Sequence, residues 1–114
     1  MGVPTVGAIV LVHFPFSDLS QTKLRPAVVL ADAGRGDWVL CQMTSKPYGD
    51  AQAIMLTTDD VQTGQLRGTG YARPGKLFTA NDDLIEHEVA RLKAEALTRV
   101  ADAVVAMLRK PTTS

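Results

Sequence analysis

The residues of this sequence that are best placed for chemistry are cations and hydroxyls next to apolar segments. Arg25 precedes Pro26, which cannot donate to a sheet ladder and therefore marks the first residue of a strand. Proline also restricts Arg25 to an extended backbone conformation. The Arg25 side chain, which is always charged and has five hydrogen-bond donors, is therefore attached to a well-defined part of the backbone. The other candidates are Thr44, Ser45 and Lys46 after the next strand, and Arg73 and Lys76 beside a later turn.

Motifs of other site classes are missing. The two histidines, His13 and His87, have no second His or Cys at a ligand spacing, so we expect no metal and no cofactor. The glycines of the 64–70 segment do not form a phosphate-binding loop, and no nucleophile elbow is present. The single cysteine, Cys41, excludes an internal disulfide and is expected to be a small buried residue.

Size and composition fit a folded protein with one core. The 114 residues predict a single domain, 1–114, and 46% apolar with 21% charged residues excludes a disordered chain. Lys plus Arg and Asp plus Glu number 12 each, so any basic surface must be local. No segment reaches the roughly 18 apolar residues of a membrane span. We therefore expect a cytoplasmic protein.

Apolar runs separated by turn residues predict a mostly β domain. The expected strands are 7–14, 25–32, 37–44 and 53–56. A loop over 15–24 joins the first two, and the conformation of 64–70 stays open. Pro74-Gly75 fits the central positions of a type II turn, which would form a hairpin or a sharp strand bend.

The last third of the chain contains an amphipathic helix. Apolar residues recur there at helical spacing, at Leu97, Val100, Ala101, Val104, Val105 and Leu108. Two starting points are open. Asp82 or Asp83 could cap a helix over 83–109, or 86–92 could be a strand with the helix beginning near Lys93. Five to seven strands and one helix predict a small, curved sheet or half-open barrel.

Strand order brings two candidates together. If the second and third strands form an antiparallel pair, the start of one and the end of the other lie at the same end of the sheet. Arg25 and Thr44 would then be neighbours. A purely structural alternative pairs Arg25 with Asp18 or Asp37 at the surface and uses Thr44 only to end a strand.

Four ordered blocks of the sequence resemble the MazF/PemK toxins of bacterial type II toxin-antitoxin modules. They begin at Gly7 (GAIVLV, then Phe-Pro-Phe), Lys23 (KLRPAVVL), Leu40 (LCQMTS) and Tyr71 (YARP, then KLFT). The resemblance covers nearly the whole chain. It implies an SH3-like barrel of five to seven antiparallel strands, with 86–92 as a strand and a C-terminal helix at about 94–109. It also implies a homodimer and an antitoxin partner.

The resemblance further implies a metal-independent endoribonuclease that cuts single-stranded RNA. The family's active pair falls on Arg25 and Thr44, with Ser45 as a stand-in or helper. The ribose hydroxyl beside the cleaved phosphate can act as an internal nucleophile, so the enzyme needs positioning and charge stabilisation more than a metal. Arg25 is expected to stabilise charge rather than act as a base. Expected RNA contacts are Lys23, Gln42, Lys46, Arg73 and Lys76.

Departures from the family pattern keep two further interpretations open. The first strand usually begins Gly-Asp, where this chain has Gly7-Ala8, and an acidic residue of some members is replaced by Ser20. A decayed member that binds antitoxin but cuts poorly is one alternative. The other is a toxin on the same barrel that binds a protein such as DNA gyrase without catalysis. The loops 17–24 and 45–52 would shape base recognition, which leaves the target sequence undetermined.

Overall fold

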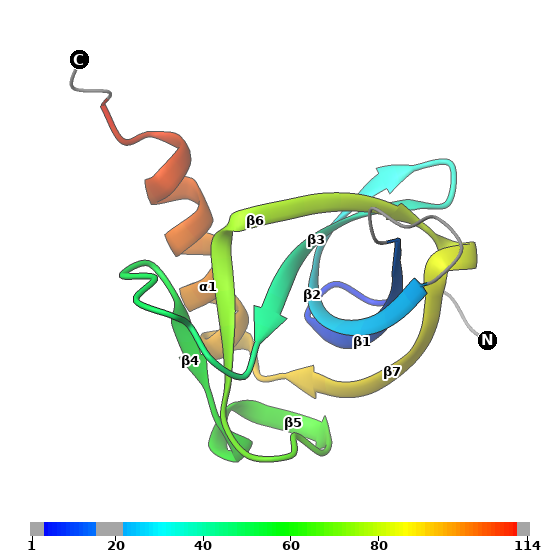
Figure 1. Ribbon diagram of the computed structural model, residues 1–114, viewed down its shortest axis with the longest axis horizontal. Coiled ribbons are helices and arrows are strands. Elements are labelled where there is room, and N and C mark those ends of the chain that lie inside the picture. Colours follow the sequence, from blue (N-terminus) through cyan, green and yellow to red (C-terminus); the bar gives the residue numbers. More distant parts are fainter. Residues whose placement is uncertain (1–3, 16–21, 112–114) are drawn as a thin grey trace.

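The computed structural model describes residues 4–15 and 22–111, which form one curved antiparallel sheet with a helix packed against it (Figure 1). The seven strands, in the sheet order β4-β6-β3-β2-β1-β7-β5, are β1 (Ala8–Pro15), β2 (Thr22–Gly34), β3 (Asp37–Thr44), β4 (Ile54–Leu56), β5 (Val61–Gly64), β6 (Gly70–Asn81) and β7 (Ile85–Leu92). The helices are η1 (Thr58–Asp60) and η2 (Asp82–Leu84), both 3-10, and α1 (Ala94–Leu108). The predicted fold class is confirmed.

Strand β2 is longer than the sequence pattern predicts. It begins at Thr22 rather than Arg25, because Thr22 pairs with Pro15 at the end of β1. It also continues to Gly34, where the turn into β3 begins. The predicted 15–24 loop is therefore shortened from both ends by strand residues, and its remainder, residues 16–21, lies outside the described residues.

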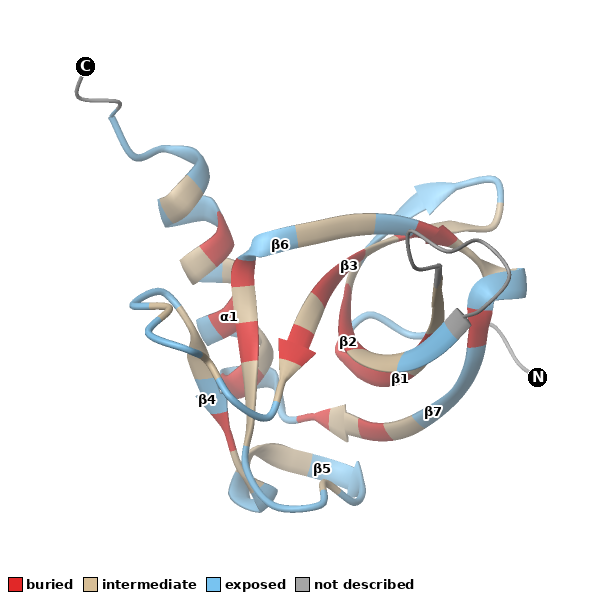
Figure 2. Cartoon of the chain, in the orientation of Figure 1, coloured by how far each residue is buried: buried red, intermediate tan, exposed pale blue. Residues whose placement is uncertain are grey.

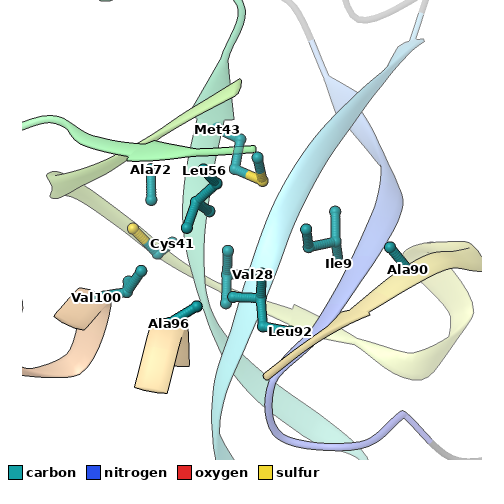
Figure 3. Close-up of a cluster of buried hydrophobic side chains, with 10 residues drawn as sticks. All are labelled: Ile9, Val28, Cys41, Met43, Leu56, Ala72, Ala90, Leu92, Ala96 and Val100. Atoms are coloured by element: carbon teal, nitrogen blue, oxygen red, sulfur yellow. The ribbon is translucent and has the colours of Figure 1, made fainter. Parts of the chain in front are cut away.

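Two apolar clusters lie on opposite faces of the central strands. The cluster between the sheet and α1 includes Ile9, Val28 and Cys41, and it meets Ala96 and Val100 of the helix (Figure 3). The second cluster, on the other face, is made by Ala8, Val10, Val12, Ala27, Val29, Trp38, Leu40, Ala80 and Ile85. Because β1 to β3 are covered on both sides, their sequences are nearly continuous apolar runs, and Figure 2 shows buried residues concentrated there.

Cys41 is a buried structural residue, as predicted. Its side chain has no exposed surface, and its Sγ donates a hydrogen bond of 3.2 Å to the carbonyl oxygen of Arg73. Burial raises the pKa of the Cys41 thiol to about 11. The thiol is therefore protonated near neutral pH and is a poor nucleophile.

Strand β6 bends where a turn was expected. The type II turn predicted at Pro74-Gly75 is wrong, because Gly75 does not have the positive φ that the third position of such a turn requires. Pro74 is fully buried within a strand that continues from Gly70 to Asn81. The register of β6 against β3 shifts at this point, between Cys41 and Met43. The bend allows one strand to pair with β3 along its length and with β4 at its start (Figure 1).

The segment before α1 is a strand. The alternative in which Asp82 or Asp83 caps a long helix is wrong, because these residues form η2 and β7 follows. The Asn81 side chain caps η2 by accepting a 3.1 Å hydrogen bond from the Asp83 amide. Helix α1 begins at Ala94 without a side-chain cap, since Lys93 supplies none. Its start is set by the end of the sheet rather than by a capping residue.

Helix α1 packs through part of the predicted apolar stripe. Ala96, Val100 and Val104 are buried against the sheet, whereas Val105 is 45% and Leu108 68% exposed. The predicted stripe is therefore only partly buried, because the C-terminal end of α1 extends beyond the sheet (Figure 1). Among the described residues, no helix combines the length and apolar character needed to cross a membrane.

Replacing Gly64 with alanine is expected to destabilise the fold. Gly64 has a φ of +79°, and a Cβ placed there would lie 2.3 Å from the Val89 carbonyl oxygen of the neighbouring strand. We expect a loss of about 2 kcal/mol or more in the free energy of unfolding, measured by urea denaturation. Gly34→Ala is the control, since Gly34 also has a positive φ of +87° but nothing within 4 Å. Equal losses in both variants would contradict the clash with β7.

Candidate functional site

The register of β2 places Arg25 and Thr44 on one face of the sheet. Val12 of β1 lies directly opposite Arg25, and Ala27 of β2 lies directly opposite Gln42 of β3. Residues that lie opposite each other in an antiparallel pair share a face, and alternate residues of a strand do so too. Arg25 is two residues from Ala27, and Thr44 is two residues from Gln42. All four side chains therefore belong to the same face.

Lys23 and Phe14 extend this face toward the loop between β1 and β2. They lie opposite each other in the β1 and β2 ladder, two residues beyond Val12 and Arg25. We call the open end of this surface the arginine face, defined by Phe14, Lys23, Arg25, Gln42, Thr44 and Phe78. It begins where the apolar cluster of Val12, Ala27 and Leu40 ends. Arg25 is half-buried at this boundary, and Lys23 is exposed.

An aromatic pair forms one wall of the arginine face. The rings of Phe14 and Phe78 have centroids 4.6 Å apart and are tilted by 58°. Phe78 reaches this face because it lies opposite Leu40 in the β3 and β6 ladder. Such a pair contributes about 0.5–1.5 kcal/mol beyond its buried area, and it leaves ring surface beside the arginine. Sequence reasoning missed the pair, because its members are far apart in the chain and only the strand order brings them together.

Thr44 ends β3 and anchors the loop that follows. Its Oγ1 donates a 3.0 Å hydrogen bond to the Lys46 carbonyl oxygen and accepts one of 3.2 Å from the Lys46 amide. The hydroxyl has one proton, so donation to a phosphate requires it to leave the Lys46 carbonyl. Thr44 can therefore either hold the loop or donate its proton to a ligand, but it cannot donate to both at the same time. Ser45 and Lys46 are both exposed beside it.

A hollow lies mainly on the other face of the sheet. Its volume is about 600 Å³, and its walls include Leu11, Pro26, Met43 and His87. Thr44 and Ser45 stand at its rim, but Arg25 and Gln42 do not line it. The cavity and the arginine face are therefore separate surfaces that meet at the end of β3.

Arg73 is held by a carboxylate. Its Nε donates a 2.9 Å hydrogen bond to Asp50 Oδ2, and the two side chains are only 26% and 17% exposed. The bond from Arg73, followed by one from the Gln52 amide, holds the pKa of Asp50 below its ordinary 3.8. This pair ties the loop between β3 and β4 to β6. Lys76, two residues beyond Pro74 of the β6 bend, is exposed.

A histidine and a carboxylate are paired elsewhere on β1. His13 Nε2 lies 2.7 Å from Glu86 Oε2. Because His13 alternates with Val12 and Phe14, strand geometry puts this pair on the other side of β1 from the arginine face. In the part of the chain that the structure describes, no group of three or more His, Cys, Asp or Glu residues could hold a metal ion.

Comparison with known families identifies the chain. Residues 5–108 match the profile of a family described as the PemK-like, MazF-like toxin of type II toxin-antitoxin systems. The chain belongs to the PemK/MazF-like toxin family. A comparison with curated protein sequences found no significant match.

Solved structures of MazF toxins share the fold of this PemK/MazF-like chain. A chain of the MazE–MazF complex from Deinococcus radiodurans aligns with a TM-score of 0.76 at 21% identity, over 97% of this chain and 100% of that one. An endoribonuclease bound to its cognate antitoxin, from a mycobacterial species, aligns at 0.70 and 13%, over 99% and 100%. The Mycobacterium tuberculosis toxin MazF-mt6 aligns at 0.69 and 14%, over 92% and 99%.

Ala8 lies where the resemblance led us to expect an aspartate. Its side chain is fully buried in the cluster with Val10 and Val29. An unpaired carboxylate at this position would be costly, whereas alanine fits the apolar surroundings. The other departure, Ser20, lies outside the described residues.

Removing the Asp50 carboxylate is expected to lower thermal stability in a pH-dependent way. Because folding lowers the Asp50 pKa, the Arg73 bond adds stability above pH 3.8, and this is lost as the pH falls through the lowered value. Asp50→Asn should therefore reduce the melting temperature at pH 5–7 and match the wild type at the lowest pH at which the chain still folds.

Arg73→Gln provides the partner variant for that experiment. It should show the same pH dependence, and the double variant should be no less stable than either single one, because all three lack the same bond. Additive losses would mean that the two residues stabilise the fold through separate contacts.

Proposed function

We propose that this chain is a metal-independent endoribonuclease toxin that cuts single-stranded RNA. The observation that carries the proposal is the joint position of Arg25, Thr44 and the Phe14 and Phe78 pair on one face of the sheet. Single-stranded RNA offers phosphates for cations and unstacked bases for aromatic rings. The arginine face presents both kinds of group side by side, in a chain of the PemK/MazF-like family.

The proposed reaction uses the RNA's own hydroxyl. The ribose 2′-oxygen attacks the adjacent phosphorus, a bond forms between them, and the bond from phosphorus to the 5′-oxygen breaks. The proton leaves the 2′-hydroxyl and one is delivered to the 5′-oxygen. The products are a 2′,3′-cyclic phosphate and a 5′-hydroxyl. The atoms balance without a water, a metal or a cofactor in this step.

Arg25 is assigned the stabilisation of the phosphorane's extra negative charge. A guanidinium donates two parallel hydrogen bonds to phosphate oxygens, and it acts most strongly where water is partly excluded, as at this half-buried position. Thr44 adds a hydroxyl donor, with Ser45 as its helper. None of the residues that define the arginine face is a carboxylate or a histidine, so the proton acceptor is not assigned to this face. Lys23, Gln42 and Lys46 contact the flanking RNA.

Partners follow from the same proposal. We propose that a cognate antitoxin covers the arginine face when the toxin is inactive, and that two copies of the chain form a homodimer. The related structures named MazE–MazF, and the mycobacterial endoribonuclease bound to its antitoxin, support an antitoxin partner. We propose a cytoplasmic location, which is where such an RNA substrate would be met.

Replacing Arg25 with alanine is expected to abolish RNA cleavage. Loss of the charge that stabilises the phosphorane should lower the rate by about 100-fold or more, because a single oxyanion donor contributes that much in other enzymes. The measurement is cleavage of a long RNA in EDTA, with the new ends mapped as cyclic phosphates and 5′-hydroxyls. Thermal unfolding should show that the variant is folded.

The matched control is Arg35→Gln. Arg35 is an exposed arginine in the turn between β2 and β3, at the opposite end of β2 from Arg25. It should cut RNA at the wild-type rate. A wild-type rate in Arg25→Ala would refute the site, and a folded wild-type protein that cuts no RNA would favour the non-catalytic, protein-binding alternative.

Thr44 variants separate the hydroxyl from the methyl group. Thr44→Ala removes both the loop anchor at Lys46 and the donor to phosphate, and we expect a 10- to 100-fold loss of kcat/KM, about the worth of one hydrogen bond to a charged group. Thr44→Ser keeps both bonds and should stay within about threefold of the wild type. A full loss in the serine variant would show that the methyl group, not the hydroxyl, matters.

A further inference from the structure

A second hollow lies at the end of the loop that begins at Thr44. Its volume is about 550 Å³, and it is formed by residues 48–52 of the loop between β3 and β4, the bend of β6 and the residues after α1. We call it the Tyr48 groove, and the residues that concern the argument are Tyr48, Asp50, Arg73, Lys76 and Lys110.

The charges of the Tyr48 groove favour a polyanion. Asp50 is the only carboxylate among its lining residues, and Arg73 neutralises it at 2.9 Å. Lys76 and Lys110 are exposed, and no ion pair with either is found among the described residues. With three cations against one carboxylate, the groove carries a net charge of +2 in a protein whose overall net charge is zero.

Tyr48 is held outward in a strained conformation. Its side chain is 84% exposed, and its φ of +50° lies in the left-handed region that aromatic residues rarely adopt. The Asp50 amide donates a 3.0 Å hydrogen bond to the Pro47 carbonyl, and Gly49 also has a positive φ, which is the pattern of a type I′ turn. Asn is usual at the position of Tyr48 in such turns. A strained, exposed ring at this position indicates a function for the ring.

The Tyr48 groove and the arginine face share strand β6. Lys76 lines the groove, and Phe78 of the arginine face is two residues further along the same strand. At the other end, Thr44 anchors the loop, and the Asp50 and Arg73 pair closes it onto β6. An RNA strand that leaves the arginine face along β6 would pass Phe78 and Lys76 before it reached Tyr48.

We propose that the Tyr48 groove binds a nucleotide of the single-stranded RNA that flanks the cleaved bond. The base of this nucleotide stacks on Tyr48, and the phosphates on either side of the nucleotide contact Lys76 and Lys110. Exposed aromatic rings beside cations are the usual means of binding single strands without sequence preference. Arg73 is then a positioning residue that holds the loop through Asp50, rather than a direct RNA contact. This inference rests on the proposed function only in its choice of RNA.

The first test measures RNA binding, independently of cleavage. The probe is a single-stranded RNA with a 2′-O-methyl group at the cut site, which removes the nucleophile, and its affinity is measured by fluorescence anisotropy across a salt series. Each lost phosphate contact lowers the slope of log affinity against log salt by about 0.7, so the doubly substituted Lys76→Gln, Lys110→Gln variant should lose about 1.4. Lys93→Gln, an exposed lysine at the start of α1, should keep the wild-type slope.

The second test separates stacking from charge. Tyr48→Ala should weaken binding of an extended RNA about 10-fold, a typical loss for one stacked base, while Tyr48→Phe should bind as the wild type does. In cleavage assays, Tyr48→Ala should raise KM for the extended RNA without changing kcat. A short RNA that spans only the cut bond should be cleaved by wild type and variant alike, because it does not reach the groove.

Charge reversal tests the positioning role of Arg73. Arg73→Gln should raise KM for the extended RNA at unchanged kcat, and the paired exchange Asp50→Arg with Arg73→Asp should restore it, because the loop closure returns. The matched control is the same exchange in the Asp60 and Arg99 pair, at 3.2 Å, which lies outside the groove and should leave KM unchanged. If Arg73 contacted phosphate itself, the exchange would not restore KM.

The outcomes distinguish this inference from the proposed function. RNA binding that depends on Tyr48 and the two lysines, in a wild-type protein that cuts no RNA, keeps the groove and overturns the proposed function. Normal cleavage of both substrates by all groove variants, with an unchanged salt slope, overturns the groove and keeps the function. Groove variants that lose binding to polyglutamate but keep binding to RNA would also overturn the RNA-binding role of the groove. The groove would then bind an acidic peptide.

Discussion

The register of β2 against its two neighbours is the constraint on which the site depends. Leu11 lies opposite Pro26 and Val12 opposite Arg25 on one side, and Ala27 lies opposite Gln42 on the other. A slip of one residue would exchange the faces of Arg25 and Pro26, moving the cation to the cavity side and separating it from Phe14. The slip is prevented because both faces of β2 are buried: Val28 belongs to one cluster, and Ala27 and Val29 to the other.

The same constraint explains how a neutral protein can present the local site that we propose for RNA. Apolar residues fill both faces of the central strands, so polar groups collect at the strand ends, where the clusters stop. Arg25 and Thr44 are such end residues, and neither is fully buried. The curved sheet then brings Phe78 of β6 to Phe14 of β1, which gives the cations an apolar wall. In this arrangement, charge, polar groups and ring surface come from four strands, and each strand contributes only one or two groups.

Loop anchoring links the two proposed RNA contacts. Thr44 fixes the start of the loop between β3 and β4 through Lys46, and Asp50 fixes its far end on Arg73. Both anchors are polar and partly exposed, so they hold the loop more weakly than the core holds the strands. A loop held in this way can adjust to the RNA while the strand that carries Arg25 stays rigid. Thr44 takes part in both roles, since its single proton serves either the loop or a phosphate.

The sequence by itself determined most of the strands, the last helix and the candidate residues, but it missed β5. Period, proline and glycine placement are local signals, so 37–44 was predicted with the bounds of β3, and Arg25 was singled out by the proline that follows it. The family blocks resolved 86–92 as a strand, where local signals left two alternatives. At Pro74-Gly75 the sequence predicted a hairpin or a strand bend, and the structure has the bend without the type II turn, because a bend shared by two partner strands uses the residues that otherwise mark a turn. The exposure of Leu108 was missed because periodicity does not say where the partner sheet ends.

Only the tertiary structure decided which distant side chains meet. The Phe14 and Phe78 pair, the Asp50 and Arg73 bond and the hollow beside Tyr48 join segments from different strands and loops. Their positions depend on the strand order β6-β3-β2-β1 and on the curvature of the sheet. Neither property can be predicted from a local sequence pattern. Sequence spacing fixes what each strand end carries. Strand order fixes which of those ends share a face, and the chemistry follows from that.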